Sequence, residues 1–99
     1  MTKIVINGCY GGFCISDDAL KYYNKLSGKS LNTCSNIPRH DPFLVQVVEE
    51  MGKNADRDVS ALVVLDIDED KYYIEEYDGK EYIITPKRME QQWVHIVKE

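Results

Sequence analysis

The chain is organised around residues 4–16, IVINGCYGGFCIS, which pass from an expected strand through a glycine-rich turn to a helix cap. Lys3 to Asn7 is a short β-branched run of the kind that forms buried strands. The glycines that follow allow backbone conformations that a side chain would forbid. Ser16 is a preferred N-cap residue, so a helix should begin directly after it. A strand, a glycine turn and a helix N-terminus in succession can bind phosphate or another anion.

The glycine spacing itself, G-x-x-G-G, matches neither the dinucleotide fingerprint nor the Walker loop. Two aspartates follow Ser16 and already fill the place that favours an anion, where they would repel a phosphate. A turn that only redirects the chain is therefore the simpler interpretation. Tyr10 and Phe13 nevertheless lie in this turn, and large aromatics there expose apolar surface unless they fold onto the core or stack on a ligand.

Composition bounds the class of protein. The 99 residues are 43% hydrophobic, which predicts a single domain over residues 1–99. With 12 basic and 17 acidic residues the net charge is −5, which argues against nucleic-acid polymers and anionic membranes as partners. A small anionic ligand needs only one or two local cations. No apolar signal segment or membrane span is expected, and three cysteines, an odd number, are expected to be reduced in the cytoplasm.

Two amphipathic helices are expected before most of the sheet. Apolar residues recur at helical spacing over residues 19–26, and Gly28 suits the position just past the end of this helix. Asp41 and Pro42 suit the N-cap and first position of a second helix, which should end at Gly52. The connections are expected at residues 28–38 and 53–58.

The remaining strands should follow the helices. Residues 59–67 are nearly all apolar, as expected of a central strand covered on both faces. Asp78-Gly79 is the strongest short hairpin signal in the chain. Further strands are expected at residues 71–77, 80–85 and 92–97. The predicted class is α+β: one amino-terminal strand, two helices, then an antiparallel meander of about four strands, with the helices packed on one sheet face.

The register of the hairpin stays open. A two-residue turn sets Glu76 against Glu81, an unfavourable pair of like charges. A three-residue loop with Gly79 in the left-handed conformation pairs Glu76 with Lys80 instead, but moves the clash to Glu75.

Both faces of this hairpin are expected to be apolar. Tyr73 and Tyr77 line one face, joined by Tyr82 in the two-residue register, while Ile74 and Ile83 line the other. One face can cover the helices; the second is exposed, covered by a partner subunit, or used to stack a ligand. Tyrosine is common on the half-exposed face of an antiparallel sheet. Among partners, a homo-oligomer is expected.

Catalytic and metal chemistry is weakly indicated. A thiolate from Cys9 or Cys14 with His40 as base needs a proximity that sequence does not show, and such cysteines are more often buried apolar groups. Cys-x4-Cys with a distant Cys34 lacks the paired short spacings of a structural zinc site. No carboxylate pair has a spacing that implies acid–base work. We predict no catalytic residue, no metal and no cofactor.

Arg39-His40 immediately precedes the second helix, where a cation adds to the anion-favouring end of the helix dipole. The alternative is that Arg39 pairs with a nearby acid on the surface. We predict a joint pocket in which aromatics of the first turn meet this charge. The two parts of the pocket can belong to one chain or to two subunits. The predicted ligand-binding residues are Tyr10, Gly11, Gly12, Phe13, Ser16, Arg39 and His40.

Several segments together resemble a family of small proteins common in phages and large viruses. They cover nearly the whole chain: residues 3–7, 9–13, 16–17, 39–42, 44–45, 47–50, 76–81 and 85–86, with Trp93. The pattern is also similar to the Thoeris anti-defence protein one family, phage sponges that sequester cyclic ADP-ribose-type immune signals without cleaving them and assemble as oligomers. Departures are the short, acidic chain and Cys14 at a position where a small residue is expected.

This resemblance implies a non-catalytic anti-defence protein in the cytoplasm of an infected cell. Its ligand would be a small nucleotide signal that contains phosphate, either a cyclic ADP-ribose isomer or a cyclic oligonucleotide. One alternative is a small phage interaction module that binds a host protein through its tyrosine-rich sheet face. A further alternative is a thiol-dependent hydrolase.

Overall fold

The computed structural model describes residues 2–57 and 60–86. Its elements are β1 (Thr2–Asn7), α1 (Asp17–Ser27), α2 (Pro42–Met51), the short 3-10 helix η1 (Gly52–Ala55), β2 (Leu62–Ile67), β3 (Tyr73–Tyr77) and β4 (Lys80–Ile84). The predicted α+β class is confirmed. The strand expected at residues 92–97 lies outside the described residues. Among the helices that are described, none has the length and apolar character needed to cross a membrane.

Both long helices begin and end at the predicted caps. The Ser16 side chain accepts a hydrogen bond from the Ala19 N–H at 3.1 Å, and Gly28 ends α1 in the left-handed conformation. Asp41 accepts from the first free N–H groups of α2, Pro42 occupies the first turn, and the helix ends before Gly52. The expected polar connection after α2 contains η1. Local capping chemistry therefore fixes both helices.

The sheet pairing differs from a single meander. Strands β1 and β2 pair antiparallel, with Ile4 opposite Leu65 and Val5 opposite Val64. The described strands form two separate two-stranded sheets, β1–β2 and β3–β4. Strand β2, expected to be central, has β1 as its strand neighbour in this part of the chain.

Strand β2 also begins later than residue 59. The Asn7 side chain accepts the N–H of Ala61, and Asp56 accepts the N–H of Leu62, each at 2.8 Å. Because a side chain takes the Ala61 N–H, which faces β1, regular pairing with β1 begins at Leu62.

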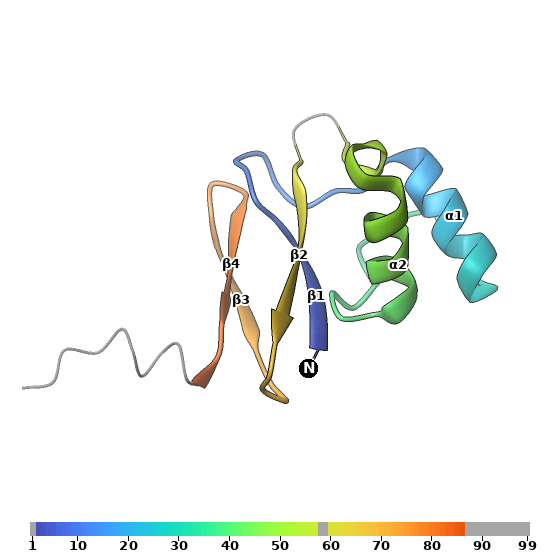
Figure 1. The fold of residues 1–99 in the computed structure, drawn as a ribbon. Helices are drawn as coiled ribbons and strands as arrows, with labels where there is room; N and C mark the ends of the chain where they lie inside the picture. The colour runs from blue at the N-terminus through green and yellow to red at the C-terminus, as the bar shows by residue number, and fades with distance from the viewer. Residues whose placement is uncertain (1, 58–59, 87–99) are drawn as a thin grey trace, which may run out of the picture.

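The β1–β2 sheet is the middle layer of three. Helices α1 and α2 lie on one side of it and the β3–β4 hairpin on the other (Figure 1). Val5 and Val64 contribute to the core shared with the helices, whereas Ile4 and Leu65 pack against Ile83 of the hairpin. The inner face of the hairpin therefore covers the first sheet, not the helices.

The hairpin has the two-residue turn, which settles the open register. Tyr77 is opposite Lys80, and Glu76 is opposite Glu81. Asp78 and Gly79 both have positive φ, 52° and 90°, as a type I′ turn requires. The pair of like charges that was expected to be unfavourable is therefore present. The negative charge of Glu81 must be balanced by a cation or by hydrogen-bond donors outside the hairpin.

Candidate functional site

The glycine turn after β1 packs directly against the tip of the β3–β4 hairpin. The Gly11 N–H donates to the Asp78 carbonyl at 3.1 Å, and the Asn7 side-chain amide donates to the Gly79 carbonyl at 2.8 Å. A Cβ on Gly79 would lie 2.2 Å from the Gly12 nitrogen. Two backbones therefore approach more closely than any side chain allows, and the glycines make this contact possible.

The negative charge of Glu81 is balanced by an ion pair beside the contact between the glycine turn and the hairpin. Its carboxylate is bound by both terminal nitrogens of Arg39, at 2.5 and 2.8 Å, and by the Asn7 backbone N–H at 2.8 Å. Glu81 is only 8% exposed. The Arg39 guanidinium also lies over the Phe13 ring, 3.5 Å from its centroid. Charge, hydrogen bonding and stacking thus converge on one arginine.

The predicted contact between the first turn and the second helix start is therefore present between Phe13 and Arg39. The partner of Arg39 is an acid, as the alternative interpretation had it, but this acid is buried and lies in β4. In this arrangement the charge of Arg39 is already matched by Glu81. Ligand binding by these residues stays a prediction.

The remaining predicted site residues lie at different places. Ser16 caps α1 and donates to the Asn54 carbonyl at 2.7 Å. Tyr10 is exposed beside Lys80, whose ammonium lies 5.7 Å from the Tyr10 ring centroid. His40 is exposed and shares a 2.8 Å hydrogen bond with the Tyr72 hydroxyl. The structure thus brings Phe13 and Arg39 together with the glycine turn, whereas the side chains of Ser16, Tyr10 and His40 contact other residues.

Both helix starts carry acidic side chains of the chain itself: Asp17 and Asp18 lie in the first turn of α1, and Asp41 caps α2. Asp41 accepts from the Phe43 and Leu44 N–H groups, and also from the Tyr23 hydroxyl at 2.8 Å. Burial raises the pKa of Tyr23, and its hydrogen bond to Asp41 raises it further. Glu76 and Asp78 are among the residues that line the hollow of about 240 Å³ beside Gly11 and Gly12. These acids would repel an anionic ligand at the positions where the sequence pattern suggested one.

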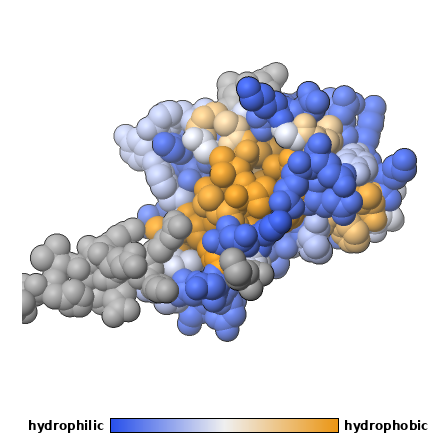
Figure 2. All heavy atoms as spheres, in the orientation of Figure 1, coloured by the Kyte–Doolittle hydropathy of each residue, from blue (hydrophilic) through white to orange (hydrophobic). Residues whose placement is uncertain are grey.

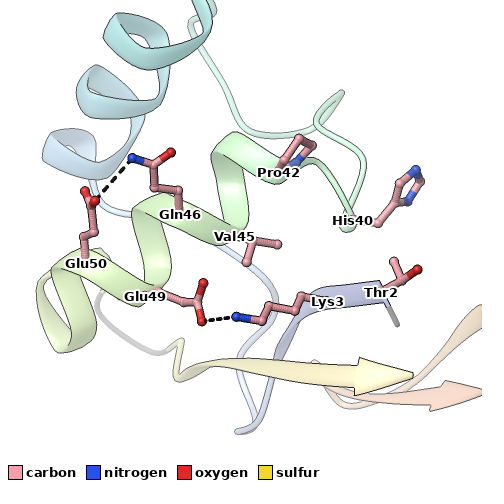
Figure 3. A pocket seen from close by; sticks show the side chains of 8 residues that line it. All are labelled: Thr2, Lys3, His40, Pro42, Val45, Gln46, Glu49 and Glu50. Carbon is pink, nitrogen blue, oxygen red and sulfur yellow. Dashed lines mark hydrogen bonds and ion pairs between the residues drawn. The ribbon is translucent and has the colours of Figure 1, made fainter. Parts of the chain in front are cut away.

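A larger groove, about 490 Å³, lies between α2 and the start of β1 (Figure 3). Lys3 and Glu49 face each other across it at 2.8 Å, and this hydrogen bond, with the charge of Glu49, raises the pKa of Lys3. Gln46 donates to Glu50 along the helix at 3.2 Å. His40 is the one predicted site residue in the lining. The Lys3 ammonium is thus paired with Glu49, and Glu50 accepts from Gln46 and from the Tyr22 hydroxyl.

The outer face of the hairpin is aromatic and exposed in part: Ile84, opposite Tyr73, is buried on it, whereas its tyrosines are exposed. Tyr73, Tyr77 and Tyr82 lie on it and are called the tyrosine face below; Tyr77 is 71% exposed. Lys80 shares this face, and its ammonium lies 5.7 Å from the ring centroids of both Tyr82 and Tyr10. A cation between two exposed aromatics is a common element of protein interfaces.

A second apolar surface follows β2. Figure 2 shows apolar side chains at the centre of the view, where β2 lies in Figure 1. Val63 is exposed, and Leu62, Val64 and Leu65 are partly buried. An apolar strand at a sheet edge is a ready template for a further strand.

The cysteine sulfurs have contacts of their own. Cys9 Sγ contacts the Asn7 side-chain oxygen and the Tyr10 carbonyl, and Cys14 Sγ contacts the Arg57 guanidinium. All three cysteines are free thiols. Within residues 2–57 and 60–86, no group of three or more His, Cys, Asp or Glu side chains is arranged to hold a metal ion.

Comparisons with protein-family models, curated proteins and solved structures find no match. The site must therefore be judged by its own chemistry. Sequence reasoning missed Asn7, Lys80 and Glu81 as its members. The one available signal was the Glu76–Glu81 clash, which required a cation or donors to face one of these acids.

Proposed function

We propose that the protein is a non-catalytic interaction module that binds a partner protein through the tyrosine face. The observation that carries the proposal is the exposure of three tyrosines on one side of a hairpin whose other side is packed in the core. Tyrosine contributes large contact area at low conformational-entropy cost and is enriched where interfaces derive most of their binding energy.

The charges on this face indicate the chemistry of the partner. Lys80 lies between Tyr10 and Tyr82, and Glu75 lies opposite Tyr82 on the same face. The fitting partner has an apolar centre and a carboxylate aimed at Lys80. Such a carboxylate would meet the Lys80 ammonium among the aromatics, in a chain whose net charge is −5.

Site-specific photocrosslinking in cells tests this proposal. A benzophenone amino acid at position 77 should capture one defined protein, and the same probe at position 43 should not, because Phe43 is exposed on α2, away from the face. With the purified partner, Tyr77→Ala,Tyr82→Ala should raise the Kd by at least about tenfold, and Phe43→Ala should leave it unchanged. Equal capture from both positions, or an unchanged Kd, contradicts the proposal.

Sequestration of a small phosphate-containing nucleotide is the second candidate function. One observation favours it: the Arg39 guanidinium stacks on Phe13 and donates to a carboxylate, the geometry with which proteins also bind phosphate. A cyclic ADP-ribose isomer or cyclic oligonucleotide at a hundred times its Kd should stabilise the fold by roughly 2.7 kcal/mol. Absence of a thermal shift argues against this function, and recovery of altered ligand would indicate turnover instead of sequestration.

We further propose that the chain forms a homo-oligomer through the edge of β2 that no described strand pairs with. The Gly8 N–H binds the Ala61 carbonyl on the β1 side, so alternation directs the backbone groups of Val64 and Asp66 away from β1. Pairing with β2 of a second copy would join two marginal two-stranded sheets into four strands. Val63→Lys should give a single-chain mass in sedimentation velocity where the parent does not, with Phe43→Lys as control; a parent mass of one chain at every concentration contradicts the assembly.

A further inference from the structure

The carboxylate of Glu81 fills a set of donors that the hairpin does not itself build. The Asn7 N–H comes from the end of β1, and both guanidinium nitrogens come from Arg39, ahead of α2. Only the occupant, Glu81, belongs to β4. Site and occupant are thus separate parts of the chain.

The donors are held in place by contacts outside the hairpin. The Arg39 carbonyl accepts the Val5 N–H at 2.9 Å, which fixes the backbone of residue 39 against β1. Its guanidinium lies on Phe13 and donates to the Val5 carbonyl at 3.4 Å. These contacts would orient the guanidinium without Glu81, so the site is organised before it is filled.

We propose that Asn7 and Arg39 form an anion-binding cradle, that Glu81 is its built-in occupant, and that the cradle takes an exogenous carboxylate or phosphate when Glu81 is withdrawn. A planar guanidinium fork with an adjacent backbone N–H matches two oxygens of either group. Because Glu81 lies in β4, an incoming anion and the seated hairpin compete for the same donors. This inference goes beyond both proposed functions and depends on neither.

The surrounding charges define what removal of Glu81 leaves behind. Glu76, opposite Glu81 on β3, is engaged by the Gly79 N–H at 3.0 Å. Because Glu76 has this partner of its own, we expect it to leave the cradle free in Glu81→Ala. The cradle then keeps the Arg39 cation and the Asn7 N–H, and gains space for a small anion. Formate has the size and the two oxygens of the missing group.

Chemical rescue tests the cradle on the full-length chain. We would measure the Tm of Glu81→Ala in sodium formate and in sodium chloride at matched ionic strength. Formate at roughly five times its Kd should raise the Tm by about 4–8 °C over chloride. Sodium phosphate in a parallel series distinguishes a preference for carboxylate from a preference for phosphate, and a saturable rise with either one supports the cradle.

Three controls separate binding from a general salt effect. The parent protein, with Glu81 in place, should show no formate-specific rise. Arg39→Ala,Glu81→Ala should show none because the cation is gone, and Glu76→Ala should show none because the cradle stays filled. Equal rises in Glu81→Ala and the double variant, or no rise in Glu81→Ala with either formate or phosphate, overturn the proposal.

The test also covers a variant that does not fold in chloride. Recovery of its circular dichroism with formate then takes the place of the Tm, and Glu81→Gln, which keeps the side-chain shape, is measured in parallel. If neither variant folds at any formate or phosphate concentration while the double variant folds, the cradle does not accept exogenous anions and the proposal fails.

Discussion

On the inner face of the β3–β4 hairpin Ile83 is 1% exposed, whereas on the outer face Tyr77 is 71% exposed. The two faces alternate along the same ten residues, since successive strand side chains point to opposite sides. The inner face contributes packing against the first sheet and the Glu81 ion pair, whereas on the outer face Ile84 is buried and the three tyrosines are exposed. If the tyrosine face binds a partner as proposed, stability and recognition belong to different sides of one element, and substitutions can separate them.

The largest effect is expected at the inner ion pair. Arg39→Ala leaves the Glu81 carboxylate buried without its cation, and should lower the free energy of unfolding by about 3–5 kcal/mol in a urea titration. Arg39→Ala,Glu81→Ala removes both charges and should cost less than Arg39→Ala alone. Lys3→Ala breaks an ion pair that is exposed and should leave the urea midpoint nearly unchanged. If Lys3→Ala and Arg39→Ala cost the same, the inner face is not where charge supports the fold.

The second-largest loss of stability is expected where the hairpin turn contacts the glycine turn. Gly79→Ala places a Cβ 2.2 Å from the Gly12 nitrogen at a residue with φ of 90°, and should cost about 2–3 kcal/mol. Gly28→Ala is the matched control, since it also has positive φ but its Cβ would meet nothing within 4 Å. It should cost about 1 kcal/mol, from backbone strain alone. Equal losses by thermal unfolding would contradict the close approach of the two backbones.

A buried tyrosine contrasts with the exposed ones. Tyr23 is fully buried and donates to Asp41, so Tyr23→Phe should cost about 1–2 kcal/mol. Because folding raises the pKa of Tyr23, its stabilising contribution is complete below about pH 10 and is lost as the pH rises through the folded-state value. Between pH 9 and 11 the parent should therefore lose more stability than Tyr23→Phe. Parallel pH profiles of the two proteins would show that this hydroxyl is not protected by folding.

The helices and the hairpin turn were predictable because their signals are local. Ser16 caps the start of α1 and Gly28 its end, and Asp78-Gly79 forms the type I′ turn. All of these depend on interactions within a few residues. The pairing of β1 with β2 joins segments about 60 residues apart, and no local pattern encodes it. The same limit hid the ion pair, whose members Arg39 and Glu81 are 42 residues apart.

The candidate site was predictable in part. The proximity of Phe13 to the second helix start was foreseen, whereas the identity of the anion was not, because the chain supplies its own carboxylate. The tyrosine face followed from strand periodicity once Asp78-Gly79 fixed the turn. Its use for ligand, subunit or partner protein depends on surfaces outside the chain, so residue patterns alone do not decide it.

The smallest effect on stability is expected on the outer face. Tyr77→Ala,Tyr82→Ala removes two exposed rings and should change the free energy of unfolding by less than about 1 kcal/mol, because neither ring supports the core. Ile83→Ala, one residue along β4 on the inner face, should cost about 2–5 kcal/mol because it empties a fully buried site. Urea titrations of the two variants measure the contrast directly. Since the outer variant stays folded, any loss of partner binding that it causes belongs to the tyrosine face; a loss as large as that of Ile83→Ala would mean that the outer tyrosines hold the hairpin together and are not free for recognition.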